Sequence, residues 1–334
     1  MSTPSRWHAT WLVTMVLAVL AAAPTPGRSQ TPPGLHRMVP DPSELRELDQ
    51  VIIEASQAIR RNPRDASAYA NRGDAYDRKG EADRAIADLS EAIRLDPRNA
   101  QALAVRGTIY AERGQFGRAF ADLNEAIRLD PKNPFYYECR AGAWVFRKKY
   151  DHAIANFTES IRLNPKAAET YVSRAMIWEM KGDLDRTIAD LNEAIRIDPS
   201  SAGTYHHRGV VNCEKRRFDD AIADFTEAIR LNPKDTHTYA NRGYAFAERR
   251  EFDKAIADLS EAIHLEPRNA VAHASRGGLY FVKHEYDRAI ADFTEAIRLD
   301  PKCSDAYEGR GRAWNARGNA KMAASDFARA KALK

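Results

Sequence analysis

A group of histidine and cysteine side chains is the part of this sequence that comes closest to a reactive cluster. His206 and His207 are adjacent, and Cys213 follows His206 by seven residues. On a helix, that separation spans about 10 Å, which is too far for the hydrogen bond between a nucleophile and its base. The interpretations left are a hydrolytic site around the two histidines, a weak accidental metal site that also uses His237, and ordinary surface lining. We expect surface lining, with no catalytic residue, no metal and no cofactor.

The usual motifs of enzymes and metal sites are absent from the sequence. It contains no glycine-rich phosphate loop and no HExxH motif. Its three cysteines, Cys139, Cys213 and Cys303, are an odd number without CxxC spacing, which argues against a disulfide framework and a zinc site. We therefore expect a protein that is not an enzyme.

The charge of the chain argues against nucleic acid as a partner. Lysine and arginine total 51 and aspartate and glutamate total 47, which gives a formal net charge of +4. These charges are spread along the sequence rather than gathered into a basic stripe. Nucleic acid is therefore not an expected partner.

The elements that must position these side chains come from a repeat of 34 residues. The segment ADLSEAIRLDP at 87–97 recurs with few changes at 121–131, 189–199, 223–233, 257–267 and 291–301, in steps of 34 residues or a multiple of 34. A fixed period of this length is typical of a solenoid. The repeats occupy 66–99, 100–133, 134–167, 168–201, 202–235, 236–269 and 270–303, and a truncated eighth repeat occupies 304–334.

Within each repeat, large and small side chains follow a fixed order. The first repeat has Tyr69, Gly73, Tyr76, Ala85 and Pro97 at positions 4, 8, 11, 20 and 32. This order resembles the tetratricopeptide repeat family, and eight copies in phase carry the resemblance over residues 66–334. The resemblance implies an all-α fold, a right-handed superhelical solenoid of antiparallel helix pairs. The sequence departs from the family pattern at Ala141, Ala175, Thr187 and Asn212.

The periodicity independently predicts two amphipathic helices in each repeat. At about 100° per residue, positions 4, 7, 8 and 11 fall on one arc of the first helix. A second helix follows with its own small and large residues, such as Ala85, Leu89 and Ala92. Pro97 and its equivalents end the second helix, and residues such as Asn99 are suited to cap the next one. One helix pair buries too little surface to be stable alone, so the repeats must stack.

The first 65 residues predict an export signal, a tether and a cap. An apolar run at 11–23 follows Arg6 and His8 and is shorter than the about 20 residues of a membrane span, so we expect a secretory signal over 1–30, with its cleavage site open. Residues 31–41 are rich in proline and predict a tether, and residues 42–65 match the second half of a repeat and predict an N-terminal capping helix. The expected location is the periplasm or the extracellular space. The alternative is a membrane anchor formed by an uncleaved signal.

Position 7 is arginine in every repeat, where the family usually has leucine. An unpaired buried charge is costly, so these arginines need partners. Position 23 is aspartate in every repeat except the third, where it is Asn156, and the two positions lie level in an antiparallel hairpin. We expect a ladder of ion pairs within or between repeats; the alternative is a row of arginines that holds acidic ligands. The predicted pairs are Arg72 with Asp88, Arg106 with Asp122, Arg174 with Asp190, Arg208 with Asp224, Arg242 with Asp258, Arg276 with Asp292 and Arg310 with Asp326.

The opposite arc of each first helix holds positions 2, 5, 9, 12 and 13. The family resemblance implies that this arc lines a concave groove, and here it varies between repeats whereas the second helices are near copies. The expected role is to bind peptides or partner helices, and the alternative is drift, with apolar residues packing on neighbouring first helices. The candidate groove residues are Phe135, Glu138, Val145, Phe146, Glu169, Val172, Met176, Met180, His206, Val210, His237, Tyr244 and Phe281.

These patterns predict an exported scaffold or adaptor that binds proteins or peptides of unknown identity. Some family members hold the C-terminal carboxylate of a chaperone with a lysine at position 5 and an asparagine at position 9. Neither residue occurs at these positions here, so we expect no chaperone-tail clamp. A self-associating structural protein, including a homo-oligomer, is the second hypothesis, and a hydrolase-like site around His206 and His207 is the third.

Overall fold

The structure is a computed structural model that describes residues 42–333, so the predicted signal (1–30) and tether (31–41) lie outside the described residues. This part of the chain forms seventeen α-helices and contains no β-strand. Its contacts divide it into an N-terminal half that ends at Pro199 and a C-terminal half that begins at Ser200. Between residues 42 and 333, no helix combines the length and apolar character that a membrane span requires.

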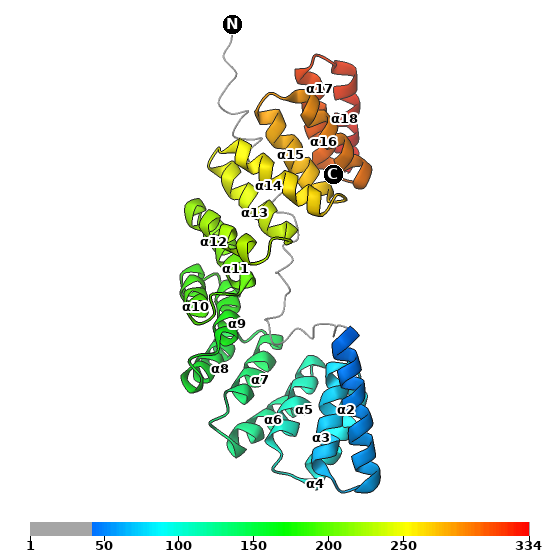
Figure 1. Cartoon of the computed structure of the whole chain (residues 1–334), viewed down its shortest axis with the longest axis vertical. Helices are drawn as coiled ribbons and strands as arrows, with labels where there is room; N and C mark the ends of the chain where they lie inside the picture. Colours follow the sequence, from blue (N-terminus) through cyan, green and yellow to red (C-terminus); the bar gives the residue numbers. More distant parts are fainter. Residues whose placement is uncertain (1–41, 334) are drawn as a thin grey trace. The chain divides into compact units, whose positions relative to one another are not determined.

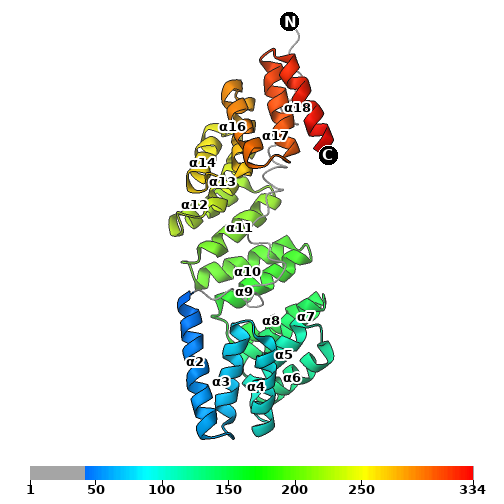
Figure 2. The same cartoon turned by 90° about the vertical axis from the view of Figure 1, so that its right-hand side faces the viewer.

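Each repeat folds into a hairpin of two helices that lie side by side (Figure 1). The first helices are α3 (Ala66–Arg78), α5 (Ala100–Glu112), α7 (Pro134–Phe146), α9 (Ala168–Met180), α11 (Ala202–Glu214), α13 (Thr236–Glu248), α15 (Ala270–Val282) and α17 (Ser304–Ala316). The second helices are α4 (Ala82–Leu95), α6 (Phe116–Leu129), α8 (Tyr150–Leu163), α10 (Leu184–Ile197), α12 (Phe218–Leu231), α14 (Phe252–Leu265), α16 (Tyr286–Leu299) and α18 (Ala320–Leu333). Within the described residues, α2 (Pro42–Arg61) precedes them and packs against α3 (Figure 2).

Local sequence signals set the helix boundaries. The Asp65 side chain accepts a hydrogen bond from the Ala68 N–H and caps α3, and the Asn99 side chain caps α5 in the same way. Gly80 adopts a φ of 81° in the turn between α3 and α4, a left-handed conformation that glycine adopts without a steric penalty. The second helices end two residues before the proline at position 32, because proline has no N–H to continue the helix.

A small residue at position 8 lets the two helices of a hairpin approach closely. In the first repeat, a Cβ atom on Gly73 would lie 2.8 Å from Leu89 Cγ, closer than carbon atoms can pack. Ala85, Leu89 and Ala92 of the facing helix are buried. Where alanine replaces glycine, at Ala141, that side chain is also fully buried. The small and large residues therefore interlock as the sequence predicts.

The arginine at position 7 pairs with the residue sixteen positions later in the same repeat. Arg106 Nε and Nη2 donate to the two carboxylate oxygens of Asp122 at 2.8 and 2.9 Å. All seven predicted arginine–aspartate pairs form, with donor–acceptor distances of 2.5 to 3.1 Å. Two parallel hydrogen bonds make this the strong form of an ion pair. In the third repeat, Arg140 Nε donates to the neutral Asn156 Oδ1 at 2.7 Å instead.

A third donor of the same guanidinium groups links successive repeats. Arg106 Nη1 donates to Ser90 Oγ of the preceding repeat at 3.1 Å. Six further arginines make the same contact, at 2.9 to 3.1 Å, with a serine, threonine or asparagine at position 25 of the preceding repeat or of α2. The ladder therefore joins helices within a repeat and also joins one repeat to the next.

The first helices form the inner side of each half. In the N-terminal half α5 packs against both α3 and α7, and in the C-terminal half α11 packs against α13 and α15 against α17. Among the described residues, no second helix packs to a comparable extent against another second helix. Helices on the concave side of a curved stack lie closest together, so these contacts place the first helices on that side.

Candidate functional site

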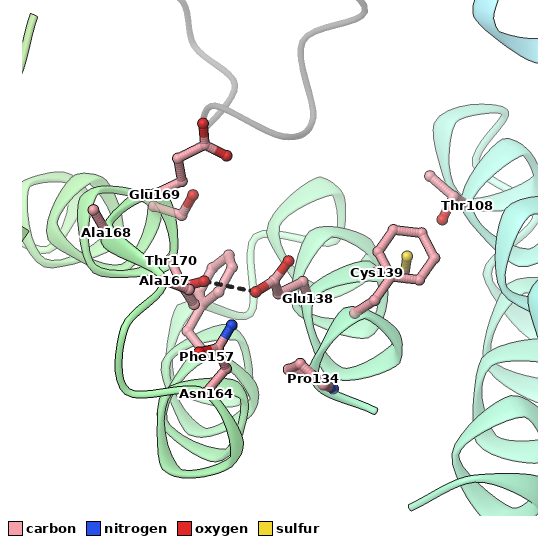
Figure 3. Close-up of a pocket in the computed structure, with 12 residues that line it drawn as sticks. Thr108, Pro134, Glu138, Cys139, Phe157, Asn164, Ala167, Ala168, Glu169 and Thr170 are labelled. Carbon is pink, nitrogen blue, oxygen red and sulfur yellow. Dashed lines mark hydrogen bonds between the residues drawn. The ribbon is translucent and has the colours of Figure 1, made fainter. Parts of the chain in front are cut away.

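A cavity of about 480 Å³ opens between the N-terminal parts of α7 and α9 (Figure 3). Three predicted groove residues, Phe135, Glu138 and Glu169, line it. Its volume lies within the range of about 300–1,000 Å³ that is typical of ligand pockets. The other lining residues are Thr108, Pro134, Cys139, Phe157, Asn164, Ala167, Ala168, Thr170 and Ser173.

Glu138 is the central acid of this cavity, and two hydroxyl groups hold its carboxylate. Its Oε1 atom accepts hydrogen bonds from Ser160 Oγ at 2.7 Å and from Thr170 Oγ1 at 2.6 Å. Ser160 lies on α8 of the same repeat and Thr170 on α9 of the next repeat, so Glu138 connects two repeats, as Figure 3 shows for Thr170. Within residues 42–333, the second oxygen, Oε2, accepts no hydrogen bond.

The cavity exists because α7 and α9 stand further apart than α5 and α7. α5 packs extensively against α7, and position 5 of α5 is the small, fully buried Ala104. α7 makes no comparable contact with α9, and position 5 of α7 is Glu138. A carboxylate must keep water or hydrogen-bond donors around it, so it cannot pack as alanine does. Glu138 therefore lines the opening at the position where α5 carries the packed Ala104.

Phe135 and Glu169 lie at the exposed edge of the cavity. The Phe135 side chain is 39% exposed, and Glu169, in the first turn of α9, is exposed as well. The residue at the N-cap of α9 is Ala167, which offers no side-chain hydrogen bond. The first backbone N–H groups of α9 therefore lack the side-chain acceptor that Asn99 supplies to α5. This edge combines an apolar ring, a carboxylate and an uncapped helix end.

Cys139 forms a buried part of the cavity wall and is not a nucleophile. Burial raises the pKa of its thiol to about 12, and the carboxylates of Glu138 and Asp77 add to this rise, while a hydrogen bond with Thr108 opposes it. The thiolate is the reactive form of cysteine, and here the thiol stays protonated at neutral pH. Cys139 therefore contributes shape and polarity to the wall.

Two predicted groove residues of repeat 3 belong to packed surfaces instead. Val145 is only 6% exposed and packs with Ile154 of α8 and Ile177 of α9, so its assignment to the groove is wrong. Phe146 is half-buried against a core cluster that includes Leu103 of α5. The helical wheel places positions 12 and 13 on the open arc. In repeat 3, however, neighbouring helices cover the side chains at these two positions. For these two residues, the alternative of packing on neighbouring helices holds.

The remaining predicted residues of the N-terminal half lie along α9. Val172 is half-buried against Ile161 and Tyr171, and Met176 is also half-buried. Met180, near the C-terminal end of α9, is 37% exposed. The uncovered apolar surface of the predicted groove is therefore concentrated at Phe135 and Met180.

In the C-terminal half, His206 occupies position 5 and makes the contact that Glu138 makes in repeat 3. Its Nδ1 atom lies 2.7 Å from Thr238 Oγ1 of the next repeat. The Thr238 hydroxyl donates to Asp235 Oδ2 at 2.5 Å, so His206 Nδ1 must be the donor to Thr238. Burial lowers the pKa of His206, with Asp235 opposing and His207 and His237 adding to the effect. The neutral imidazole therefore serves as a link between repeats.

Cys213, on the same helix as these histidines, carries a thiol rather than a reactive thiolate at neutral pH. Burial, helped by Glu248 and Glu214, raises the pKa of its thiol to about 12. No group of three or more histidine, cysteine, aspartate or glutamate side chains in residues 42–333 is arranged to hold a metal ion. The described contacts of His206 are those of a link between repeats.

The other predicted residues of the C-terminal half are partly covered. Val210 packs against a cluster that contains Phe225, and Phe281 is half-buried with its ring centroid 5.4 Å from that of Tyr286. Tyr244 is half-buried and donates to Glu248 Oε1 at 3.3 Å. His237 is half-buried in the first turn of α13, where its backbone N–H donates to the Asp235 side chain. These side chains lie on the first helices but do not line the cavity described above.

The sequence pattern does not predict a role for the threonines at position 3. Thr170 and Thr238 are the partners of Glu138 and His206, and each lies at position 3 of the following repeat. The one hint in the sequence is that each repeat with Glu138 or His206 at position 5 is followed by a repeat with threonine at position 3. That hint can be interpreted only after the structure shows that position 5 contacts position 3 of the next repeat.

Hairpins of two helices, stacked in phase with their first helices inward, define an all-α repeat protein with a recess between first helices. A family model described as tetratricopeptide repeat matches residues 54–97, 71–134, 145–202, 214–272 and 275–334. The chain therefore belongs to the tetratricopeptide repeat family, as the sequence pattern predicts. No curated protein sequence matches the chain.

Solved structures with a similar fold share little sequence with this chain. A tetratricopeptide repeat protein from Parabacteroides merdae has 21% identity and a TM-score of 0.51, covering 70% of this chain and 93% of its own. YrrB, described as having an unusual peptide-binding site, has 20% identity and a TM-score of 0.50, covering 55% of this chain and 95% of its own. Yeast Tom70 has 18% identity and a TM-score of 0.52, covering 96% of this chain and 66% of its own. At these identities the similarity concerns the fold alone.

Proposed function

We propose that this chain is a scaffold that binds partner proteins or peptides on the first-helix side of its stacked hairpins, without catalysis. Family membership supports an interaction role, since helical repeats of this kind provide extended binding surfaces. YrrB, which has the same fold, is described as having a peptide-binding site, so peptides are the first class of ligand to test. The cluster around His206, which links repeats through Thr238, supports a structural role for the side chains closest to enzyme chemistry.

The observation that carries this proposal is the cavity between α7 and α9. Its lining includes the exposed carboxylate residue Glu169 and the Phe135 ring, which is 39% exposed. An apolar ring beside hydrogen-bonding groups in a recess is the usual composition of a binding site. We therefore place the primary contact of the partner at Phe135, Glu138 and Glu169.

Site-specific photo-cross-linking tests this placement. A benzophenone amino acid at Phe135 is expected to cross-link a partner in cells that produce the full chain. The same group at Ala155, an exposed position of α8, serves as the control. Equal cross-linking at both positions, or cross-linking at Ala155 alone, would contradict the placement.

Export is a further part of the proposal. It is supported by the cationic start, the short apolar run and the small residues within 1–30, which lie outside the described residues. Fractionation of cells, with N-terminal sequencing of the chain, tests it. A chain that stays in the cytoplasm with Met1 or Ser2 at its N-terminus would contradict it.

Self-association is a second candidate, favoured by the surface of the last helix. Met322 and Phe327 of α18 are 42% and 39% exposed, whereas the equivalents of Phe327 in the other repeats, such as Leu89 and Phe293, are buried. A second copy that covered these side chains would give a mass that rises with concentration. Light scattering of the chain and of a Phe327→Ser variant separates this candidate from a monomeric adaptor.

A further inference from the structure

The inner side of the first four repeats is acidic, although the whole chain has a formal net charge of +4. Positions 2, 5, 9, 12 and 13 of these repeats carry six acids and one base. That base, Arg78, is already engaged, because its Nη2 donates to Glu44 Oε1 at 2.5 Å. The six acids are Asp74, Asp77, Glu112, Glu138, Glu169 and Glu179.

On the second helices of the same half, glutamate carboxylates are paired with arginine. Glu125 of α6 receives two hydrogen bonds from Arg128, at 2.6 and 2.7 Å, and Glu159 of α8 receives two from Arg162, at 2.7 and 2.9 Å. At the cavity, Glu138 is bound by hydroxyl groups only, and Glu169 has no ion-pair partner in the described chain. The carboxylates of the second helices are thus neutralised locally, whereas those at the cavity are not.

The cavity between α7 and α9 is also large enough to hold more than a single ion. Glu138 presents its unoccupied Oε2 in a cavity of about 480 Å³ that reaches the buried side chains of Cys139 and Phe157. Phe135 at the edge supplies an exposed apolar ring. A dissolved metal ion would use neither the ring nor this volume. A chain with a cationic side chain and an adjoining apolar side chain would use both.

We infer that the cavity between α7 and α9 binds an extended peptide segment that presents a lysine or arginine beside a large apolar residue. The cationic group lies between the Glu138 and Glu169 carboxylates, and the apolar side chain packs on Phe135. Charge complementarity selects the segment and accelerates its association, and the apolar contact holds it. This inference rests on the proposed function and specifies the chemistry of the partner.

Selection from a random library of displayed dodecapeptides on the full chain tests the inference. The expected result is enrichment of peptides with lysine or arginine next to leucine, isoleucine, phenylalanine or tryptophan. The most enriched peptide is then synthesised with a fluorescent label, and its dissociation constant is measured by anisotropy. The Glu138→Gln, Glu169→Gln double variant is expected to weaken binding by at least about tenfold, or about 1.4 kcal/mol, because the cationic side chain loses both of its charged acceptors.

A matched variant controls for loss of charge in general. The Glu125→Gln, Glu159→Gln double variant removes the same two charges from the second helices of the same half and is expected to leave the affinity unchanged. Circular dichroism melting checks that both variants fold, and glutamine at 138 keeps an oxygen that can accept from Ser160 and Thr170.

The outcomes separate the inference from the proposed function. Enriched peptides that lack basic residues, but lose binding in a Phe135→Ala variant, would overturn the inference and leave the proposed groove in place. Basic peptides that bind both double variants equally would also overturn it. A library that yields no binder on the full chain would contradict the peptide-binding function itself.

Discussion

Glu138 and Thr170 join repeat 3 to repeat 4, because Thr170 Oγ1 donates to Glu138 Oε1 at 2.6 Å. His206 and Thr238 are in contact at the equivalent positions of repeats 5 and 6. Position 5 is alanine in four of the eight repeats, so these polar contacts are local additions to a common framework. At Glu138 the same side chain therefore helps to hold two repeats together and lines the cavity where we place the partner.

Replacing Glu138 by alanine is expected to destabilise the N-terminal half. The hydroxyl groups of Ser160 and Thr170, both buried, would lose their acceptor, and leaving such groups unsatisfied costs about 1–3 kcal/mol. Glu138→Gln should cost less, because its amide oxygen can still accept. Urea titrations followed by circular dichroism measure the difference. Equal midpoints for Glu138→Ala and the wild-type chain would show that these hydrogen bonds contribute nothing.

Replacing Arg106 by alanine is expected to cost about 3 kcal/mol, because Asp122 would be left with an uncompensated buried charge. Asp122 is only 8% exposed and receives two hydrogen bonds from Arg106. Arg94→Ala is the control, since Arg94 makes a similar two-donor pair with Glu91 on an exposed surface, where ion pairs contribute little. Similar shifts in the unfolding midpoint for the two variants would contradict a structural role for the ladder.

Asn156→Asp is expected to stabilise repeat 3 by about 1 kcal/mol, since a carboxylate forms a stronger hydrogen bond with arginine than an amide does. Arg140 is the one position-7 arginine that faces a neutral residue, and burial lowers its pKa. The loss of the hydrogen bond from Asn156 Nδ2 to the His152 carbonyl opposes part of the gain. Thermal melting measures the net effect. A lower melting temperature would mean that repeat 3 is adapted to the uncharged partner.

The stability of the C-terminal half is expected to fall as the pH drops below about 6.5, the usual pKa of histidine. Burial lowers the pKa of His206 in the folded chain, so the unfolded chain takes up a proton first as the pH falls. The stabilisation is therefore complete above the unfolded pKa and decreases below it. His206→Gln keeps a hydrogen-bonding group that does not titrate, so its melting temperature should fall less between pH 7.5 and 5. Parallel pH profiles for the variant and the wild-type chain would exclude His206 as the cause.

The fold could be predicted from sequence because one physical constraint is repeated eight times. Each small residue such as Gly73 faces a large one such as Leu89, and seven of the eight position-7 arginines have a carboxylate within reach, as Arg72 has in Asp88. The spacing of these residues fixes the hairpin and its ion pair together. The third arginine hydrogen bond, to Ser90 and its equivalents, was not foreseen, because it depends on how one hairpin is placed on the next.

The candidate site could be predicted only in part for the same reason. Phe135, Glu138 and Glu169 were identified because they lie on the open arc of their helices, and they do line one cavity. Val145 lies on the same arc of the wheel but is covered by Ile177 of the next repeat. A helical wheel describes one helix, whereas exposure on the inner side is decided by contacts between repeats.

Hydrogen–deuterium exchange of the full chain, with and without the most enriched basic peptide, tests the central claim most directly. The account predicts that bound peptide slows exchange in α7 (Pro134–Phe146) and in the first turns of α9 (Ala168–Met180), and leaves exchange in α6 (Phe116–Leu129) and α8 (Tyr150–Leu163) unchanged. Slower exchange confined to the second helices, or no change in α7 and α9 at saturating peptide, would contradict binding on the first-helix side.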